Sequence, residues 1–247
     1  MLLSLRRGIL SGLVGGLLAA GFAAALAEPL MDRAVDLEAA RAAAAGQSGV
    51  ETFSRSTQHF GLVGAAIVVG VAFGILYGVL HRLLHPTEPS AVDTAWGRAL
   101  RLGGSGFFAV SLVPFLRYPS NPPGIGDPGT IDSRSQLWEL SIVIGLVGVV
   151  AAGLVARSLR ERRTRSSVRQ LAVVGVLVAT VALTFVLPGN TDPIAAPVTL
   201  VWEFRLLSLA SLVLLWGGLA VTFGLVSERA ATTAGTGRSR VSSLPAG

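Results

Sequence analysis

Six long apolar stretches dominate the sequence and limit what the chain can fold into. A helix that crosses a bilayer needs roughly 20 consecutive, mostly apolar residues, and each stretch is close to that length. Only 14% of the residues are charged, against about a quarter in soluble domains. The sequence therefore predicts an all-α, polytopic bundle of about six transmembrane helices. The expected spans are residues 8–27, 60–80, 99–116, 137–156, 170–187 and 205–226.

The distribution of arginine predicts how this bundle is oriented. With the N-terminus inside, the inside segments hold 14 arginines and 4 acids, and the outside segments hold 6 arginines and 10 acids. Cytoplasmic loops carry the excess of basic residues, so we expect a multi-pass protein of the inner (plasma) membrane with both termini in the cytoplasm. An alternative stays open for residues 1–27. Arg6, Arg7, the apolar run and the sequence ALA at 25–27 also resemble a cleavable secretory signal.

Two further patterns concern packing and the end of the chain. Residues 230–247 are small, polar and basic, which predicts a disordered cytoplasmic tail after a transmembrane domain of residues 1–229. Glycines spaced four residues apart form one face in each of the first two spans, and such faces let helix backbones approach closely. We expect these faces to pack within the chain rather than to form a dimer. They consist of Gly8, Gly12, Gly16, Gly70, Gly74 and Gly78.

Missing residue types exclude several functions. The chain contains no lysine and no cysteine, which excludes a P-loop lysine, a lysine Schiff base and thiolate chemistry. No nucleophile elbow, zinc-protease or dinucleotide-binding motif is present, so we expect neither an enzyme nor a permanently bound cofactor. The net charge of +6 follows from the basic cytoplasmic loops, and we expect the chain to contact the lipid bilayer and not nucleic acid.

Polar and ionisable residues gather at the expected outer ends of the spans. Such groups are costly near a membrane and often mark a site of transport or binding. The loop 117–136 is rich in proline and glycine, which indicates an ordered loop that can present side-chain oxygens to a hydrated cation. Interfacial anchoring is the simpler interpretation for any single residue. The group contains Glu28, Arg55, Gln58, His59, Arg117, Tyr118, Asn121, Asp127, Glu139, Glu203 and Arg205.

Two of the three histidines lie close together at the opposite end of the second span. His81 and His85 are four residues apart, so one helix face can present both. With no cysteine in the chain and no acid directly beside them, we expect interfacial histidines without a ligand role.

Four passages of the sequence carry distinctive motifs. They are AEP at 27–29, SRSTQ at 54–58, VPFLRYPSNPP at 113–123 with GDP at 126–128, and WEFRL at 202–206 with SL at 208–209. Together they resemble the CbtA family, which is described as predicted cobalt transporter subunits of bacteria. The third passage is the most distinctive, because its prolines, tyrosine and basic residue are hard to combine by chance. The likeness covers about residues 5–230.

The resemblance implies a subunit of a transporter that takes up cobalt, and a small, His-rich, single-span membrane protein as its partner. Under this hypothesis Co²⁺ is the substrate. Its expected oxygen ligands are Glu28, Asn121, Asp127 and Glu203. Arg55, Gln58, Arg117, Tyr118 and Arg205 are expected to support them. The alternative is a membrane scaffold or assembly partner that transports nothing itself.

Overall fold

The computed structural model describes most of the chain, and its secondary structure is helical. Within the described residues there is no β-strand, and six helices are long and apolar enough to cross a membrane, which confirms the predicted all-α, polytopic fold. The described backbone covers residues 1–44, 46, 55–87, 89–90, 93–123, 125–190, 192, 194 and 196–242, and the side chains of residues 28, 55–60, 128 and 231–242 are outside the description. The six candidate spans are Leu2–Ala27, Gly61–Leu84, Ala95–Arg117, Ile131–Glu161, Ser166–Thr184 and Val198–Ala230.

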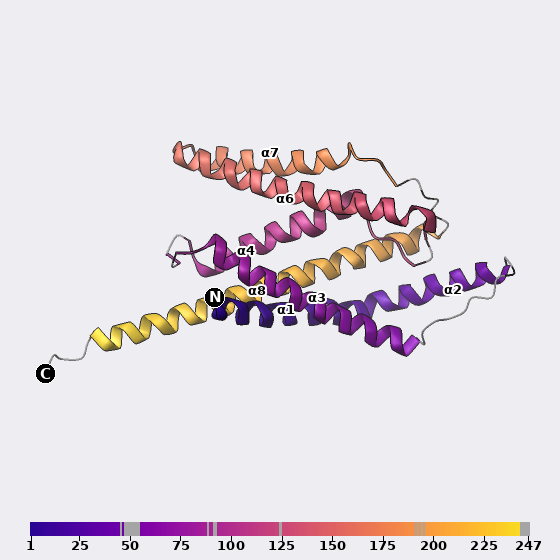
Figure 1. Cartoon of the computed structure of the whole chain (residues 1–247), viewed down its shortest axis with the longest axis horizontal. Helices are drawn as coiled ribbons and strands as arrows, with labels where there is room; N and C mark the ends of the chain where they lie inside the picture. Colours follow the sequence, from indigo (N-terminus) through magenta and orange to yellow (C-terminus); the bar gives the residue numbers. More distant parts are fainter. Residues whose placement is uncertain are drawn as a thin grey trace. The chain divides into compact units, whose positions relative to one another are not determined.

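Figure 1 shows the helices, coloured along the sequence from indigo at the N-terminus to yellow at the C-terminus. Contacts divide the chain into two compact units, which are described separately below. Unit 1 comprises Met1–Gly21, Arg55–Gly104 and Val213–Gly247, and unit 2 comprises Phe22–Ser54 and Ser105–Leu212. The elements are α1 (Leu2–Phe22), a π-helical segment (Ala23–Ala27), α2 (Glu28–Ala44), α3 (Arg55–Leu84), α4 (Ala95–Gly106), a second π-helical segment (Phe107–Leu112), α5 (Val113–Arg117), a 3₁₀ turn (Pro128–Thr130), α6 (Ile131–Glu161), α7 (Ser166–Thr184) and α8 (Val198–Ser242).

Both π-helical segments precede a proline. Pro29 is the second residue of α2 and Pro114 is the second residue of α5. Proline has no N–H to donate and its ring collides with the preceding helical turn. A π segment widens that turn, and the N–H of Val113 donates to the carbonyl of Phe108, five residues back. The third span therefore passes Pro114 without an intervening loop.

In unit 1 the glycine faces of α1 and α3 pack against each other. A Cβ added to Gly16 would lie 2.8 Å from the carbonyl oxygen of Ala66, and one added to Gly74 would lie 2.8 Å from Cα of Gly12. Backbones can approach this closely only where side chains are absent. The predicted packing of these faces within the chain is confirmed.

The middle of α8, residues 215–227, forms the centre of unit 1. Leu219 is fully buried and Phe223 is 1% exposed. Gly218 packs on α1, where a Cβ would lie 2.9 Å from Cα of Gly15. The rings of Phe223 and Tyr77 meet edge to face with their centroids 5.1 Å apart, an arrangement that stabilises aromatic pairs.

An ion-pair cluster holds the connection between α3 and α4. Arg98 is 5% exposed; its Nε donates to a carboxylate oxygen of Asp93 at 2.7 Å and its Nη1 donates to the carbonyl of Thr87 at 2.7 Å. Arg101 donates to the other carboxylate oxygen. Partial burial raises the pKa of Asp93, but the hydrogen bonds from both arginines outweigh it and hold the pKa below its usual value of 3.8.

Asp93→Ala is expected to lower the free energy of unfolding by about 1–2 kcal/mol, because a buried guanidinium loses a charged acceptor while Asp93 itself is partly solvated. A carboxyl group whose pKa is lowered in the folded state stabilises the fold above its usual pKa, and this contribution is lost as the pH falls through the lowered value. Melting temperatures of wild type and variant should therefore converge as the pH is lowered below 3.8.

Glu161→Ala is the matched control. It removes a carboxylate whose partner Arg157 is 79% exposed, so a change of at most about 0.5 kcal/mol is expected. Equal losses of unfolding free energy in the Asp93 and Glu161 variants would contradict the assigned role of Asp93. So would a difference in melting temperature between wild type and Asp93→Ala that does not narrow in acid.

In unit 2 the helices α6 and α7 pair through small and hydroxyl residues. Gly148 faces Thr180, and Gly145 faces the backbone of Ala109 in the π-helical segment, with 2.9 Å between an added Cβ and Cα of Ala109. The buried hydroxyls bond to their own helices: Ser141 to the carbonyl of Leu137 at 2.9 Å and Thr180 to that of Val176 at 2.8 Å. Polar groups within a bilayer must be satisfied internally in this way.

The outward faces of the spans are apolar. Val68, Val147 and Leu171 are 68%, 63% and 71% exposed, and contiguous apolar surface of this kind is expected where lipid replaces water. The last helix, α8, continues to Ser242, beyond the predicted end of the sixth span at residue 226. The predicted disordered tail, residues 230–247, stays a prediction.

Candidate functional site

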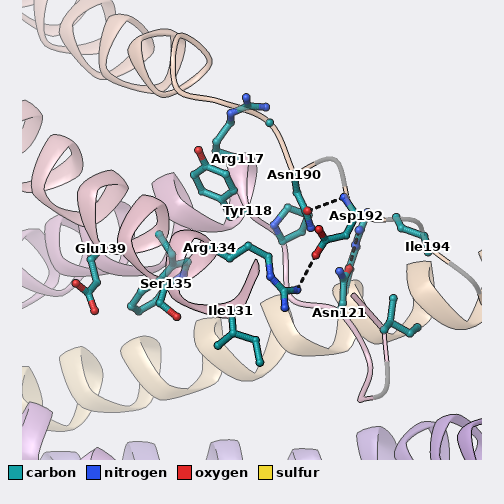
Figure 2. A pocket seen from close by; sticks show the side chains of 15 residues that line it. Arg117, Tyr118, Asn121, Ile131, Arg134, Ser135, Glu139, Asn190, Asp192 and Ile194 are labelled. Atoms are coloured by element: carbon teal, nitrogen blue, oxygen red, sulfur yellow. Dashed lines mark hydrogen bonds and ion pairs between the residues drawn. The ribbon is translucent and has the colours of Figure 1, made fainter. Parts of the chain in front are cut away.

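A pocket of about 640 Å³ lies in unit 2, among the C-terminal end of α5, the first turns of α6, the segment after α7 and the start of α8. Figure 2 shows its side chains. Tyr118, Ile131 and Trp138 contribute apolar or aromatic walls. We call it the loop pocket. Its polar and charged lining residues are Arg117, Tyr118, Asn121, Arg134, Ser135, Glu139, Asn190, Asp192 and Arg205.

Asp192 joins three parts of this pocket. Its side chain is 6% exposed and lies 3.3 Å from Nη1 of Arg134, toward which it points in Figure 2. The same carboxylate oxygen accepts hydrogen bonds from the backbone N–H of Asp127 at 3.2 Å and the hydroxyl of Thr130 at 2.9 Å. Gly126 next to it has φ +114°, and a side chain there would collide with the Arg134 guanidinium. Glycine is therefore required at this turn.

Arg117 and Tyr118 tie the end of α5 to the segment after α7. Arg117 donates to the carbonyl of Leu187, and the Tyr118 hydroxyl donates to the carbonyl of Pro188 at 2.7 Å. The Arg117 guanidinium also lies 5.4 Å from the ring centroids of Tyr118 and Phe185, within the range of a cation–π interaction.

Arg205 connects the start of α8 to the proline-rich loop. Its Nη2 donates to the side-chain oxygen of Asn121 at 2.8 Å. This bond joins the third and fourth of the sequence passages described above, whose residues lie 84 positions apart. The two passages therefore meet in one pocket.

The pocket contains more positive than negative charge. Three guanidiniums line it, from Arg117, Arg134 and Arg205, against the two carboxylates of Glu139 and Asp192. The Nε atom of each arginine is buried, and within the described part of the chain none of them has a hydrogen-bond partner.

Comparison with known protein families agrees with the motif passages. A family model for a probable cobalt transporter subunit, CbtA, matches residues 4–228. The chain belongs to the CbtA family. No curated protein and no solved structure gives a significant match. The match includes all four passages and every residue that lines the loop pocket.

The structure brings together some of the residues predicted for the CbtA-type site. Asn121, Arg117, Tyr118 and Arg205 line the loop pocket, and the side-chain oxygen of Asn121 already accepts a hydrogen bond from Arg205. Asp127 lies beside the pocket, where its carboxylate accepts the N–H of Gly129 at 2.8 Å.

The other predicted residues lie apart or outside the description. Glu203 is exposed and does not line the pocket. The side chains of Glu28, Arg55 and Gln58 are outside the described residues. Among the side chains that are described, no group of three or more His, Asp or Glu could hold a metal. The predicted ligand set therefore stays a prediction.

Arg134 and Asp192 were missed by the sequence analysis. Arg134 lies in the loop predicted over 117–136, and Asp192 lies between the fifth and sixth predicted spans, at 170–187 and 205–226. Nothing local distinguishes either residue from a solvated charge. Their pairing depends on tertiary structure.

The histidine pair lies in unit 1, at the end of α3. The rings of His81 and His85 have centroids 4.8 Å apart, and His81 also stacks on Phe223 at 4.7 Å. Nδ1 of His85 lies 3.1 Å from the carbonyl of His81. Burial lowers the pKa of His85, the bond to His81 opposes this, and Arg98 lowers it further. The two imidazoles pack against each other, and His81 also packs against Phe223. Their lack of a ligand role stays a prediction.

Proposed function

We propose that this chain is the membrane-spanning subunit of a cobalt uptake transporter of the inner membrane, and that it moves its cargo without chemical conversion. The observation that carries the proposal is the family match over residues 4–228, on a chain with six helices long enough to span a membrane. A polar pocket at one end of an apolar bundle supports it, because solutes need a hydrated entry point.

The orientation of the chain in this proposal rests on the arginine asymmetry of the sequence. Segments on the side of both termini carry 14 of the 20 arginines, which favours placing that side in the cytoplasm. The loop pocket then opens on the outer side, where an incoming solute can reach it. Cobalt is cargo in this proposal, and no resident cofactor is required.

The cargo would meet both oxygen ligands and arginines. Asn121, Asp127, Glu203 and Glu28 remain the predicted oxygen ligands, since carboxylates and amides suit divalent cations. The arginines Arg117 and Arg205 hold neighbouring segments through the bonds to Leu187 and Asn121. These bonds help to keep the entry loops in place.

The family description as a subunit implies a partner in a transporter complex. We propose a small, His-rich, single-span membrane protein for this role. The chain itself has three histidines and no cysteine, whereas selective binding of a transition metal favours imidazole or thiolate ligands. Capture by a His-rich partner would supply this selectivity.

The proposal is tested by uptake of radioactive ⁵⁷Co²⁺ into cells that express the chain, with and without the neighbouring small membrane protein, under limiting metal. We expect uptake that depends on the chain and rises further with the partner. Uptake that is unchanged by the chain would contradict the proposal. A stable complex with the partner but no flux in reconstituted vesicles would instead indicate a scaffold.

The ligand role of Asp127 is tested in the same assay. Asp127→Asn retains the oxygen that accepts the Gly129 N–H and removes the charge, whereas Asp127→Ala removes both. We expect loss of uptake in both variants and unchanged uptake in Asp132→Asn, an exposed residue of the first turn of α6. Normal uptake in Asp127→Asn would show that Asp127 only shapes the loop.

A further inference from the structure

The charges of the loop pocket do not suit a bare divalent cation. Asp192 already pairs with Arg134 at 3.3 Å and accepts two further hydrogen bonds. Arg117 and Arg205 donate to neutral oxygens, those of Leu187 and Asn121. A free cation in this pocket would therefore face two guanidiniums whose observed acceptors carry no charge, and like charges repel most strongly where water is scarce.

The arginines also retain unused donors. Each guanidinium has five N–H groups in a planar fork that matches two carboxylate oxygens. Arg117 and Arg205 each use an Nη2 group for the bonds to Leu187 and Asn121. Other N–H groups of both forks therefore remain available to an anion in the pocket that these residues line.

The size of the pocket fits a small organic molecule. Its volume is about 640 Å³, within the usual range for small-molecule sites. A cation with six waters would occupy roughly 180 Å³, at about 30 Å³ per water. Tyr118, Ile131 and Trp138 provide walls for a carbon skeleton, which an inorganic ion would not use.

We propose that the loop pocket binds a small polycarboxylate, with Arg117 and Arg205 as its principal contacts, and that the transporter accepts its metal there as a carboxylate chelate. The second part rests on the proposed function. A metal chelate presents carboxylate oxygens to the arginines and its metal ion to Glu139. Figure 2 shows Glu139 apart from the ion pair of Asp192 and Arg134. The pocket then matches both signs of charge on one solute.

Calorimetry on the purified full chain in neutral detergent tests the proposal, with citrate, Co²⁺–citrate, Co²⁺ alone, inorganic phosphate and phosphatidylglycerol as separate probes. We expect citrate and its cobalt complex to bind. Arg205→Lys retains the charge and a donor for Asn121 but loses the planar fork, so it should weaken citrate binding about tenfold with an unchanged melting temperature. Arg117→Gln should weaken it similarly.

Arg157→Gln is the control, because Arg157 is 79% exposed and pairs with Glu161 outside the pocket. Four outcomes overturn the proposal: no binding of citrate by the wild type, citrate binding unaffected at Arg117 and Arg205, binding of phosphate or phosphatidylglycerol but not citrate, or binding of Co²⁺ alone in preference to its citrate complex. Citrate binding without cobalt uptake by cells would contradict the proposed function and leave the carboxylate site standing.

Discussion

Gly74→Leu is expected to lower the free energy of unfolding by about 3 kcal/mol, the upper end of the cost of overpacking. A Cβ at this position would collide with the carbonyl oxygen of Gly8 and would lie 2.8 Å from Cα and 2.9 Å from N of Gly12. All three atoms belong to the backbone of α1, so no side chain can rotate away. The only relief is to separate α1 from α3.

Thermal unfolding in detergent, followed by size-exclusion chromatography, measures this effect. Gly64→Leu is the matched control on the same helix, since nothing lies within 4 Å of a Cβ added at Gly64. Both changes raise helix propensity by similar amounts, and only the contact with α1 differs. If the two variants unfolded at the same temperature, the close packing of α1 on α3 would be contradicted.

Asp192→Ala should have the second-largest effect, a loss of about 2–3 kcal/mol of unfolding free energy. The substitution leaves the hydroxyl of Thr130, the N–H of Asp127 and the guanidinium of Arg134 without their common acceptor. The Arg134 side chain is 29% exposed, so water can compensate for only part of the loss. We expect the segment around Gly126 to detach from the loop after α7.

Hydrogen exchange measures this local loss directly. Amides of residues 126–135 should exchange faster in Asp192→Ala, while the amides of the α6–α7 helix pair keep their protection. Asp132→Ala is the control: Asp132 is exposed in the first turn of α6, where a carboxylate contributes only about 0.3–1 kcal/mol through the helix dipole. Unchanged exchange near residue 126 would show that Asp192 does not hold the loop.

Much of the fold could be predicted because membrane insertion is governed by local sequence. The length and apolarity of each span are sufficient for its recognition, and the structure places six candidate spans over the expected stretches. The glycine faces could also be predicted from the sequence, since residues four positions apart lie on the same side of a helix. The passage of the chain through Pro114 was less obvious, because it depends on a π-helical turn that has no simple sequence signature.

The candidate site was only partly predictable. Asn121 and Arg205 were recognised from the motif passages, but only the structure shows that these passages meet, through a hydrogen bond of 2.8 Å between the two side chains. Arg134 and Asp192 could not be recognised, because a charged residue at a helix start or in a loop is usually solvated. Asp192 becomes important only through contacts with residues 62 and 65 positions earlier in the chain.

The sequence by itself determined that this chain spans a membrane with six helices, which glycine faces bring helices together, and which family it resembles. These properties follow from residue type and from spacing along single helices. Only the tertiary structure decided that three arginines and a paired aspartate line one pocket. Charge in a site is a sum over segments distant in sequence, so no single segment carries that information.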